Sequence, residues 1–363
     1  MSKLIHVKEN GKQIYDITIE SNYNKLEQVF SKLNIAGHRV CIVSDTTISG
    51  YYMEEVMSIA KKQASTVVSF TLQPGEEYKN LDSVSKLYEY LIQCKFDRKD
   101  FLIALGGGVV GDLTGYVSAT YLRGISFIQM PTTLLSMVDS SIGGKTGVDF
   151  AAYKNMIGAF KQPVAVYINT STLNTLTERL YYSGFGEVLK YGYIQDAEFD
   201  LWLKEHVSEL LEMEPKALEY MIYRSCENKR IVVEEDPKEQ GIRAILNFGH
   251  TLGHAIEKMM NFELLHGECV SIGMVAASYI SYKRGMISEK ELNDIVATLQ
   301  QYQLPVSVKQ LDESDLIDIT KNDKKMEAGN IKFILIDGIG NAIIDSTVTN
   351  EEMIEGFRYV IAK

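Results

Sequence analysis

The sequence of 363 residues contains few cysteines: Cys41, Cys94, Cys226 and Cys269, widely separated and without a C-x-x-C pair. This scatter excludes a disulfide-rich scaffold and favours a reducing, cytoplasmic location. No stretch approaches the 18 apolar residues of a membrane-spanning helix. The opening residues, MSKLIHVKENGK, contain no apolar segment of the signal-peptide kind, so we expect no secretory signal.

Positive charge is also scarce. The 37 Lys and Arg residues are outnumbered by 48 Asp and Glu, which gives a net charge of −11. This balance leaves no basic surface for nucleic acid or for an anionic membrane, so we expect neither as a partner. With 45% hydrophobic and 23% charged residues, the chain has the composition of a soluble globular protein that is long enough for two domains.

The first half of the sequence has the pattern of a parallel sheet. Residues 3–8 and 14–19 alternate apolar and polar side chains around Glu9-Asn10-Gly11, which predicts a β-hairpin. Short apolar runs then alternate with helical stretches, and this order is typical of a parallel sheet covered by helices on both faces. The runs are residues 40–44, 66–71, 101–105, 125–130 and 164–168, and the helical stretches are 23–33, 51–63, 80–95 and 110–121.

Three of the six histidines lie in one window, RAILNFGHTLGHAIEKMMNFELLHGE, at residues 243–268. Apolar residues at helical spacing predict a helix here, with His250 and His254 on one face near its start. Because neutral imidazole is a common metal ligand, this i, i+4 pair with His266 nearby predicts a metal site. A hydrogen-bonded polar face is the alternative explanation for the pair.

A carboxylate ligand is available in YYSGFGEVLKYGY, where Glu187 lies on a predicted helix with Lys190 on the same face. One Glu with two His makes a catalytic zinc site that leaves a position open for water or a substrate hydroxyl. The spacing leaves open whether the two histidines are His250 with His254 or His250 with His266.

From about Ser171 the predicted strands stop, and residues 172–300 have the pattern of successive helices. Near the end, residues 331–346 predict a hairpin, and a terminal helix begins at Asn350. We therefore expect an α/β fold: an N-terminal parallel-sheet nucleotide-binding domain at 1–170 and a mainly α-helical C-terminal metal- and substrate-binding domain at 171–363. The active site is expected in a cleft between them.

A glycine-rich turn, FLIALGGGVVGDLTGYV, satisfies G-x-G-x-x-G between a predicted strand and a predicted helix. Glycines and a helix N-terminus together accommodate a phosphate, although close helix–strand packing would also explain them. No acidic residue follows at the usual offset of about twenty residues, so Asp45, Glu76 and Lys79, at other strand ends, are candidates for the ribose and adenosine. The second cluster, DSSIGGKTG, is no P-loop because Asp139 stands where the first glycine is required.

Basic residues lie close to these turns and helix starts, although the whole protein is acidic. Solvated surface lysines are the ordinary explanation. Their proximity to the other motifs instead suggests an anion site formed by Lys145, Lys154, Lys190, Lys229 and Arg243, together with the neutral Asn155.

Taken together, these segments resemble the 3-dehydroquinate synthases of the sugar phosphate cyclase superfamily over essentially the whole chain. The matching segments are PGEEYK, GGGVVGD, MPTTLLSMVDSSIGGKTGVD, KNMIGAF, GEVLKYG, RAILNFGHTLGHAIE, LHGE and NDKK. No single segment is decisive, but their joint occurrence in this order is specific, and none departs from the family pattern at a motif residue.

The resemblance implies NAD and zinc as cofactors, with Co²⁺ as a possible substitute for zinc. It assigns the metal to Glu187, His250 and His266 and places His254 in the substrate pocket, against the simplest reading of the spacing. The implied NAD contacts are Asp45, Glu76, Lys79, Gly107, Gly108, Asp112, Thr132, Thr133, Lys145, Lys154, Thr172, Leu173, Asn174 and Thr175. The implied substrate contacts are Arg123, Asp139, Lys145, Lys154, Asn155, Lys190, Lys229, Glu239, Arg243, Asn247, His254 and Lys324, which is favoured over Lys325.

The implied reaction is the second step of the shikimate pathway to chorismate, a phosphate-eliminating lyase reaction. It converts 3-deoxy-D-arabino-heptulosonate 7-phosphate to 3-dehydroquinate and phosphate through transient oxidation by NAD, phosphate elimination, re-reduction, ring opening and aldol cyclisation. The resemblance also implies a homodimer. The main alternative is a metal-dependent polyol dehydrogenase of the glycerol dehydrogenase type, which would release NADH and would not need so many anion-binding lysines. Other cyclases of the superfamily, and a zinc-stabilised binding module without catalytic activity, are further alternatives.

Overall fold

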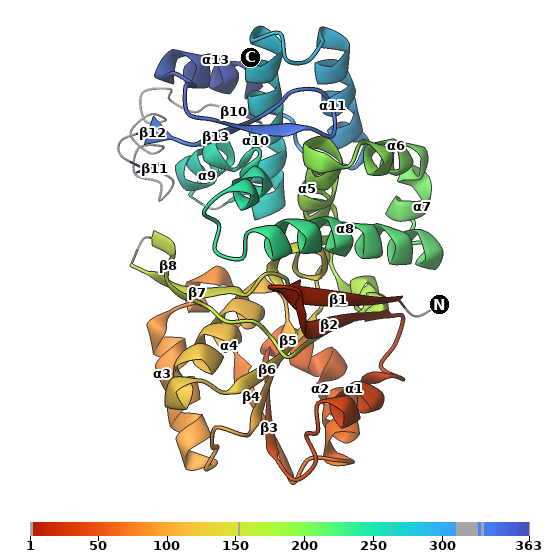
Figure 1. The fold of residues 1–363 in the computed structure, drawn as a ribbon, viewed down its shortest axis with the longest axis vertical. Coiled ribbons are helices and arrows are strands. Elements are labelled where there is room, and N and C mark those ends of the chain that lie inside the picture. The colour runs from red at the N-terminus through yellow and green to blue at the C-terminus, as the bar shows by residue number, and fades with distance from the viewer. Residues whose placement is uncertain (1–2, 152, 262, 310–325, 328–329, 363) are drawn as a thin grey trace. The chain divides into compact units, whose positions relative to one another are not determined.

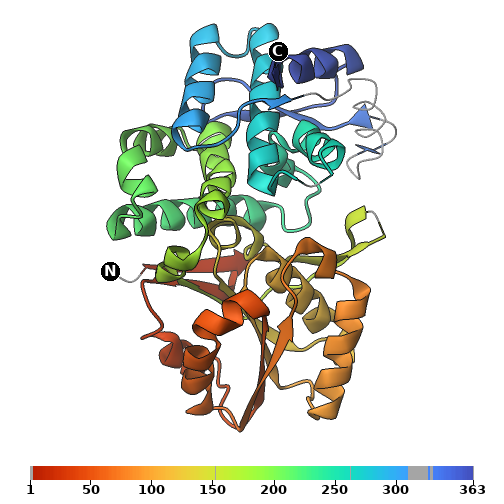
Figure 2. The ribbon, with the colours of Figure 1, turned by 180° about the vertical axis from the view of Figure 1, so that it is seen from behind.

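The computed structural model describes residues 3–151, 153–261, 263–309, 326–327 and 330–362 (Figures 1 and 2). The chain divides into two compact units, Met1–Leu176 and Thr177–Lys363. This division follows the short 3-10 helix η4 (Thr170–Thr175), whereas the boundary expected from the sequence, between residues 170 and 171, falls inside that helix. In the part of the chain that the structure describes, none of the helices combines the length and apolarity that crossing a bilayer requires.

Unit 1 is built on a seven-stranded sheet in the order β1-β2-β9-β6-β5-β3-β4. β1 and β2 form the predicted antiparallel hairpin, and every other neighbouring pair in the sheet is parallel. The parallel α/β fold is therefore confirmed. The strands are β1 (Lys3–Glu9), β2 (Lys12–Glu20), β3 (Arg39–Asp45), β4 (Thr66–Leu72), β5 (Phe101–Gly106), β6 (Ser126–Pro131) and β9 (Ala165–Asn169).

Helices cover both faces of this sheet (Figure 1). Along β3, Val40 and Ile42 face a core with helices α1 (Leu26–Lys32) and α2 (Thr46–Lys61). Cys41 and Val43 face the opposite core, which contains α3 (Leu81–Gln93) and α4 (Gly108–Thr120). Because successive side chains of a strand point to opposite faces, an uninterrupted apolar run such as residues 40–43 is what a strand buried on both faces requires.

A second hairpin, β7 (Lys145–Phe150) with β8 (Tyr153–Phe160), was not predicted. Gly147 pairs with Gly158 in its register, and a Cβ on Gly158 would lie 2.5 Å from the carbonyl oxygen of Thr146. Glycines at the centre of both strands weaken the alternating pattern by which a strand is recognised. A one-turn π-helix, η3 (Ser136–Ser140), precedes this hairpin.

Unit 2 is mainly helical, as predicted. Its helices are α5 (Glu178–Gln195), α6 (Ala197–Glu205), α7 (Val207–Leu211), α8 (Pro215–Glu235), η5 (Ile242–Asn247), α9 (His250–Met259), α10 (His266–Lys283), α11 (Glu289–Gln301) and α13 (Asn350–Val360). The predicted C-terminal hairpin is β13 (Phe333–Ile336) with β14 (Ala342–Asp345). Two-residue strands complete the unit: β10 (Val308–Lys309) pairs with β15 (Ile361–Ala362), and β11 (Met326–Glu327) pairs with β12 (Asn330–Ile331).

Candidate functional site

Glycines let the helices of unit 2 approach closely where the histidines lie. A Cβ on Gly267, the second residue of α10, would lie 1.8 Å from the carbonyl oxygen of Ser183 on α5. A Cβ on Gly186 would in turn lie 2.5 Å from the carbonyl oxygen of Gly267. Each of these two glycines is adjacent in sequence to a candidate ligand, Glu187 or His266, so the crossing of α5 and α10 carries the two ligands toward each other.

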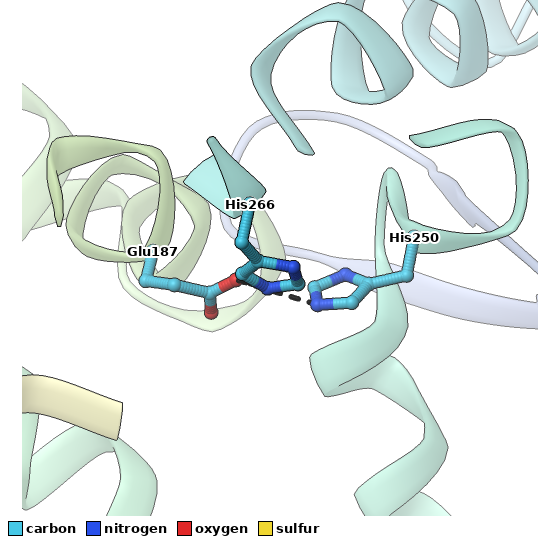
Figure 3. Close-up of side chains that lie close together, drawn as sticks. All are labelled: Glu187, His250 and His266. Atoms are coloured by element: carbon cyan, nitrogen blue, oxygen red, sulfur yellow. Dashed lines mark ion pairs between the residues drawn. The ribbon is translucent and has the colours of Figure 1, made fainter. Parts of the chain in front are cut away.

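The structure brings Glu187, His250 and His266 together, from α5, α9 and α10 respectively (Figure 3). Glu187 Oε1 lies 3.3 Å from His250 Nε2 and 3.5 Å from His266 Nε2. One potential ligand atom from each residue lies within 4.8 Å of the others. Three donors of the kinds that zinc prefers therefore converge on one small volume.

The protonation of His250 can be derived from its neighbours. Its Nδ1 lies 3.1 Å from the carbonyl oxygen of Phe248, which can only accept, so Nδ1 carries the proton. Burial and the nearby charge of Lys190 lower the pKa of His250 to about 3, so the ring holds only this one proton at neutral pH. Its Nε2 therefore presents a lone pair to the carboxylate of Glu187.

Two acceptors thus face each other across 3.3 Å, the bare Nε2 of His250 and Oε1 of Glu187. Oε1 is buried, and no hydrogen-bond donor among the described residues reaches it. Such an arrangement is unfavourable unless a cation lies between the acceptors, and the backbone carbonyl that holds Nδ1–H is the usual outer partner of a metal-bound imidazole. The residues present therefore fit a divalent metal ion.

Lys190 lies one turn after Glu187 on α5, is buried, and contacts the other carboxylate oxygen of Glu187 directly. Burial alone would raise the pKa of Glu187, but the ammonium of Lys190 lowers it well below its usual value. Glu187 is therefore a carboxylate at neutral pH, as a metal ligand must be.

The ring of His254 lies beside this group, with its centroid 5.2 Å from that of His250 and 5.8 Å from that of His266. His254, Glu257 and His266 form a second set whose potential ligand atoms lie within 4.8 Å of one another. Glu257 is buried one turn after His254 on α9, and its part in this cluster was not anticipated from the sequence.

The segment between α8 and α9 is organised around Asp236, which was also not anticipated. Its carboxylate accepts hydrogen bonds from the backbone N–H groups of Gln240, Gly241 and Arg243, at 2.9, 2.7 and 3.1 Å. Burial alone would raise the pKa of Asp236, but these donors and the charge of Arg243 lower it. An Asp at a helix end followed by a proline and a glycine is the signal that could have revealed this turn.

Predicted substrate contacts lie on this organised segment. Arg243 is almost fully buried, and its Nη1 donates to the carbonyl oxygen of Pro237 at 2.7 Å. Asn247 Nδ2 donates to Glu239 Oε1 at 2.9 Å. Lys229, on α8, is also buried. Three basic residues among the predicted substrate contacts are therefore buried in unit 2: Lys190, Lys229 and Arg243.

In unit 1 the predicted NAD contacts follow the carboxyl ends of parallel strands, which lie along one edge of the sheet. Asp45 ends β3; Glu76 and Lys79 follow β4; Gly107, Gly108 and Asp112 follow β5; Thr132 and Thr133 follow β6; and Thr172–Thr175 follow β9. β3 and β5 are neighbours in the sheet. From β3 the chain continues to β4 on one side of this pair, and from β5 it continues to β6 and then β9 on the opposite side. The ends of β3 and β5 therefore flank the topological switch point, where open α/β sheets bind ligands.

Hydrogen bonds join three of these strand ends. Thr132 N donates to the carbonyl oxygen of Gly106 at 3.0 Å, and Thr172 Oγ1 lies 3.4 Å from the carbonyl oxygen of Thr132. The hydroxyl of Thr132 is buried and makes no hydrogen bond within the described residues. Gly107, the N-cap of α4, offers no side chain to the N–H groups of that helix. A buried hydroxyl and a free helix start at one edge fit a phosphate-bearing ligand.

Lys79 connects the loop after β4 to α4 and to the second hairpin. Its Nζ donates to Asp112 Oδ2 at 2.7 Å and to Asn155 Oδ1 at 2.6 Å. Burial opposes the charge of Lys79, but Asp112 and Glu76 outweigh it and raise the pKa. Asp149, which the sequence analysis did not single out, accepts a 2.7 Å hydrogen bond from the backbone of Asn155.

The remaining predicted residues are placed as follows. The carboxylate of Asp45 caps α2 by accepting from Thr47 N and Ile48 N. Arg123 ends the 3-10 helix η2 (Tyr121–Arg123) with a left-handed backbone, Asp139 lies in η3, and Lys145 and Lys154 lie on β7 and β8. Lys324 and Lys325 lie outside the described residues.

Comparisons with known proteins assign most of this chain to one family. Residues 69–183 match the model of the 3-dehydroquinate synthase N-terminal domain, and residues 184–326 match that of the C-terminal domain. The 3-dehydroquinate synthase of Acetivibrio thermocellus is 44% identical over 341 residues, which are 94% of each chain.

Solved structures share the fold over the whole length. A 2-deoxy-scyllo-inosose synthase, complexed with carbaglucose-6-phosphate, NAD⁺ and Co²⁺, has a TM-score of 0.88 at 24% identity, covering 99% of this chain and 100% of that one. A 2-epi-5-epi-valiolone synthase from Streptomyces hygroscopicus, with NAD⁺ and Zn²⁺ bound, has a TM-score of 0.87 at 26% identity, covering 98% and 99%. Glycerol dehydrogenase from Schizosaccharomyces pombe is more distant, with a TM-score of 0.68 at 12% identity over 94% and 87%.

Proposed function

The chain belongs to the 3-dehydroquinate synthase family, and we propose that it converts 3-deoxy-D-arabino-heptulosonate 7-phosphate to 3-dehydroquinate and phosphate. The observation that carries the proposal at the site is the convergence of Glu187, His250 and His266, with two bare acceptors facing each other beside a buried lysine. The family relationship makes the chain a phosphate-eliminating lyase of the shikimate pathway, which supplies the aromatic amino acids.

The metal ligands in this proposal are Glu187, His250 and His266. One carboxylate and two imidazoles make a set that zinc favours and that Co²⁺ also accepts, and three protein ligands leave a position open. Among solved relatives, the valiolone synthase binds Zn²⁺ and the inosose synthase Co²⁺. When bound, the ion supplies Lewis-acid polarisation of a substrate oxygen, and NAD supplies a hydride acceptor that also returns the hydride.

Unit 1 holds NAD in this proposal. The glycine turn after β5 and the buried hydroxyl of Thr132 suit the pyrophosphate, since both lie at the carboxyl edge of the sheet. Lys79 and Asp112 form a fixed ion pair at the same edge, which orders the loop that carries Glu76. Both solved relatives with the highest structural similarity reported above contain NAD⁺.

The proposed substrate carries a carboxylate and a phosphate, and this chain contains basic side chains of the kind that bind such anions. Lys190, Lys229 and Arg243 are buried in unit 2 although the protein has a net charge of −11. Arg243 presents a planar guanidinium fork suited to a carboxylate or a phosphate. We place Arg123, Asp139, Lys145, Lys154 and Asn155 of unit 1 in the substrate set, together with Glu239, Asn247 and His254 of unit 2.

A polyol dehydrogenase of the glycerol dehydrogenase type remains the second candidate, because that enzyme shares the fold. The identities favour the first candidate, since the 3-dehydroquinate synthase of Acetivibrio thermocellus is 44% identical to this chain and the glycerol dehydrogenase is 12% identical. The two functions also differ in whether reduced cofactor is released. A dehydrogenase accumulates NADH, whereas the proposed reaction is redox-neutral overall and returns NAD after every turnover.

The test is an assay of inorganic phosphate release from the heptulosonate phosphate, with NADH absorbance recorded in the same sample. We expect one phosphate for each substrate consumed, no net NADH, and loss of activity on treatment with a chelator that zinc or Co²⁺ restores. Accumulation of NADH in step with a polyol would favour the dehydrogenase, and turnover that survives complete metal removal would exclude the metal site.

A cytoplasmic location and a homodimer complete the proposal. The four cysteines are free, as expected in a reducing compartment, and three of them are buried. Light scattering coupled to size-exclusion chromatography gives the molar mass directly, and twice the 40.9 kDa of one chain is the expected value.

A further inference from the structure

Helix α10 is held at each end by an Arg–Glu pair, and the pair at its start surrounds a candidate metal ligand. Arg179, near the start of α5, donates from Nε to Glu268 Oε1 and from Nη2 to Glu268 Oε2, both at 2.8 Å. Nη2 also donates to the carbonyl oxygen of Glu263 at 2.9 Å. Glu268 Oε2 in turn accepts from the backbone N–H of Leu265 at 2.7 Å.

These bonds enclose His266, which is the first residue of α10. First turns of helices fray because their N–H groups lack partners within the helix. Here the guanidinium of Arg179 holds the carboxylate of Glu268, two positions after His266, and that carboxylate accepts from the backbone N–H of Leu265, just before His266. Arg179 lies eight positions before Glu187 on α5, about 12 Å along the helix axis.

We propose that Arg179 and Glu268 are a positioning pair that holds His266 toward Glu187 and thereby sets the affinity of the protein for its divalent metal ion. This inference rests on the metal site proposed above. Arg179 can hold three acceptor oxygens because its guanidinium is a planar fork, and a lysine cannot reproduce that geometry. Without the pair, the start of α10 is less ordered in the metal-free protein. Metal binding must then also order His266, and this cost lowers the affinity.

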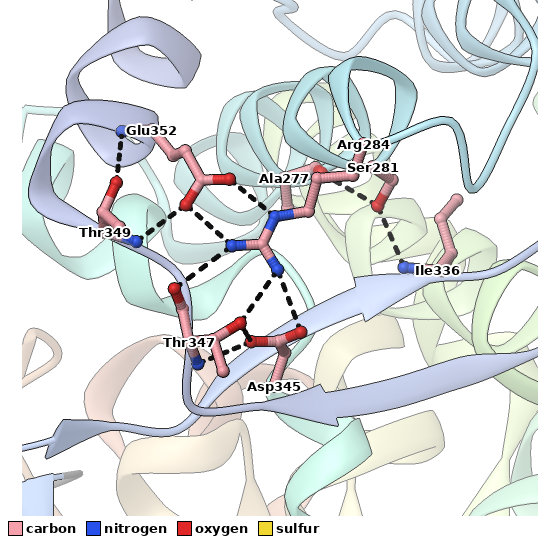
Figure 4. Close-up of polar contacts among 8 residues, drawn as sticks. All are labelled: Ala277, Ser281, Arg284, Ile336, Asp345, Thr347, Thr349 and Glu352. Atoms are coloured by element: carbon pink, nitrogen blue, oxygen red, sulfur yellow. Dashed lines mark hydrogen bonds and ion pairs between the residues drawn. The ribbon is translucent and has the colours of Figure 1, made fainter.

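The opposite end of the same helix supplies a matched control (Figure 4). Arg284, the residue that caps α10, donates from Nε and Nη2 to both carboxylate oxygens of Glu352, at 2.6 and 2.7 Å. Its Nη1 donates to Asp345 Oδ2 at 3.0 Å. This pair has the same chemistry as Arg179 with Glu268, but it lies at the other end of an 18-residue helix and contacts none of the candidate ligands.

The experiment measures the zinc dissociation constant of metal-free protein by competition with a chromogenic chelator, for wild type, Arg179→Ala, Arg179→Lys and Arg284→Ala. We expect zinc affinity to fall about tenfold or more in both Arg179 variants, in the range found for residues that orient metal ligands. We expect Arg284→Ala to keep wild-type affinity. Thermal unfolding of the metal-free proteins shows whether the two alanine variants lose similar stability.

Equal zinc affinities for Arg179→Ala and Arg284→Ala would overturn the inference, and so would a loss in Arg179→Ala that Arg179→Lys fully restores, because charge rather than geometry would then be responsible. Glu187→Gln separates this inference from the proposed site. If Glu187→Gln retains wild-type zinc affinity, the site itself is wrong. If it abolishes binding while Arg179→Ala has no effect, only the positioning role is wrong.

Discussion

The imidazole of His250 illustrates how one backbone contact decides the chemistry of a side chain. The carbonyl oxygen of Phe248 holds the proton on Nδ1, and the lowered pKa keeps a second proton off the ring. His250 Nε2 therefore needs no deprotonation before it binds a metal ion at neutral pH.

The two histidines that neighbour His250 are expected to differ in function. His266→Ala should remove a ligand and abolish both zinc binding and turnover, because Glu187 and His250 alone make a weak site. His254→Ala should retain zinc and lose activity, if His254 serves the substrate. Zinc content per chain after dialysis, measured by atomic emission, distinguishes the two. Loss of zinc in the His254 variant would restore the metal pair suggested by the i, i+4 spacing.

At the scale of the elements, the crossing of α5 and α10 depends on Gly267. Gly267→Ala should destabilise the protein by about 1–3 kcal/mol or more, since the new methyl group would meet the backbone of Ser183. We expect zinc affinity to fall as well, because the two helices that carry Glu187 and His266 must move apart.

Gly50→Ala is the control for this change. Gly50 lies in α2, and a Cβ there meets nothing within 4 Å, so the substitution should stabilise the helix by about 0.5–1 kcal/mol. Chemical denaturation and zinc titration of both variants provide the comparison. Unchanged zinc affinity in Gly267→Ala would show that the close crossing is not what brings the ligands together.

The turn after α8 depends in the same way on Asp236. Asp236→Ala should lower kcat/KM about tenfold or more, mainly through KM, because the turn that carries Arg243 loses its central acceptor. Zinc content should not change.

Asp100→Ala provides the comparison in unit 1, where the carboxylate of Asp100 likewise accepts from backbone N–H groups, those of Arg39 and Asp97. Both variants should lose about 1–2 kcal/mol of stability. Steady-state kinetics with the heptulosonate phosphate should show the rise in KM for Asp236→Ala alone. Equal kinetic losses would mean that Asp236 contributes only to stability.

For the whole molecule, the Arg284–Glu352 pair predicts a dependence of stability on acidity. The two hydrogen bonds from Arg284 lower the pKa of Glu352 from 4.5 to about 2. As the pH falls, Glu352 is protonated at a higher pH in the unfolded chain than in the folded protein. The stabilisation is therefore complete above about pH 4.5 and is lost as the pH falls toward 2. After allowance for solvent screening, the loss should be about 1–2 kcal/mol.

Urea denaturation at pH 5.5 and pH 3.5 measures this loss, with Glu352→Gln as the comparison. The variant should be less stable than wild type at pH 5.5, and the difference should narrow at pH 3.5. A constant difference across this interval would show that the carboxylate of Glu352 is not titrating in the expected range.

The sheet was predictable from the sequence because its strands are buried on both faces. Val40, Cys41, Ile42 and Val43 must all be apolar, since two cores lie on either side of them. The β7–β8 hairpin was not predicted, because Gly147 and Gly158 replace the side chains that would mark an alternating strand.

The sequence alone identified candidate residues for the site but did not determine which of them lie together. Helical periodicity identified α9, but the choice between His254 and His266 beside His250 depends on how α10 crosses α5, and that crossing is a tertiary property of Gly186 and Gly267. The resemblance to a family, rather than spacing, favoured His266. Asp236, Glu257 and the Arg179–Glu268 pair were not singled out, because each acts through backbone or side-chain partners that sequence patterns do not reveal.

The order of strands in unit 1 also has a consequence for synthesis of the chain. Ile17 of β2 pairs with Val166 of β9, a contact that spans about 150 residues. Until β9 has left the ribosome, the N-terminal hairpin has no neighbour and the edge of β6 is uncovered. We therefore expect the sheet of unit 1 to close last, just before the first helix of unit 2 emerges from the ribosome. We expect the nascent chain to be most prone to aggregation before that closure.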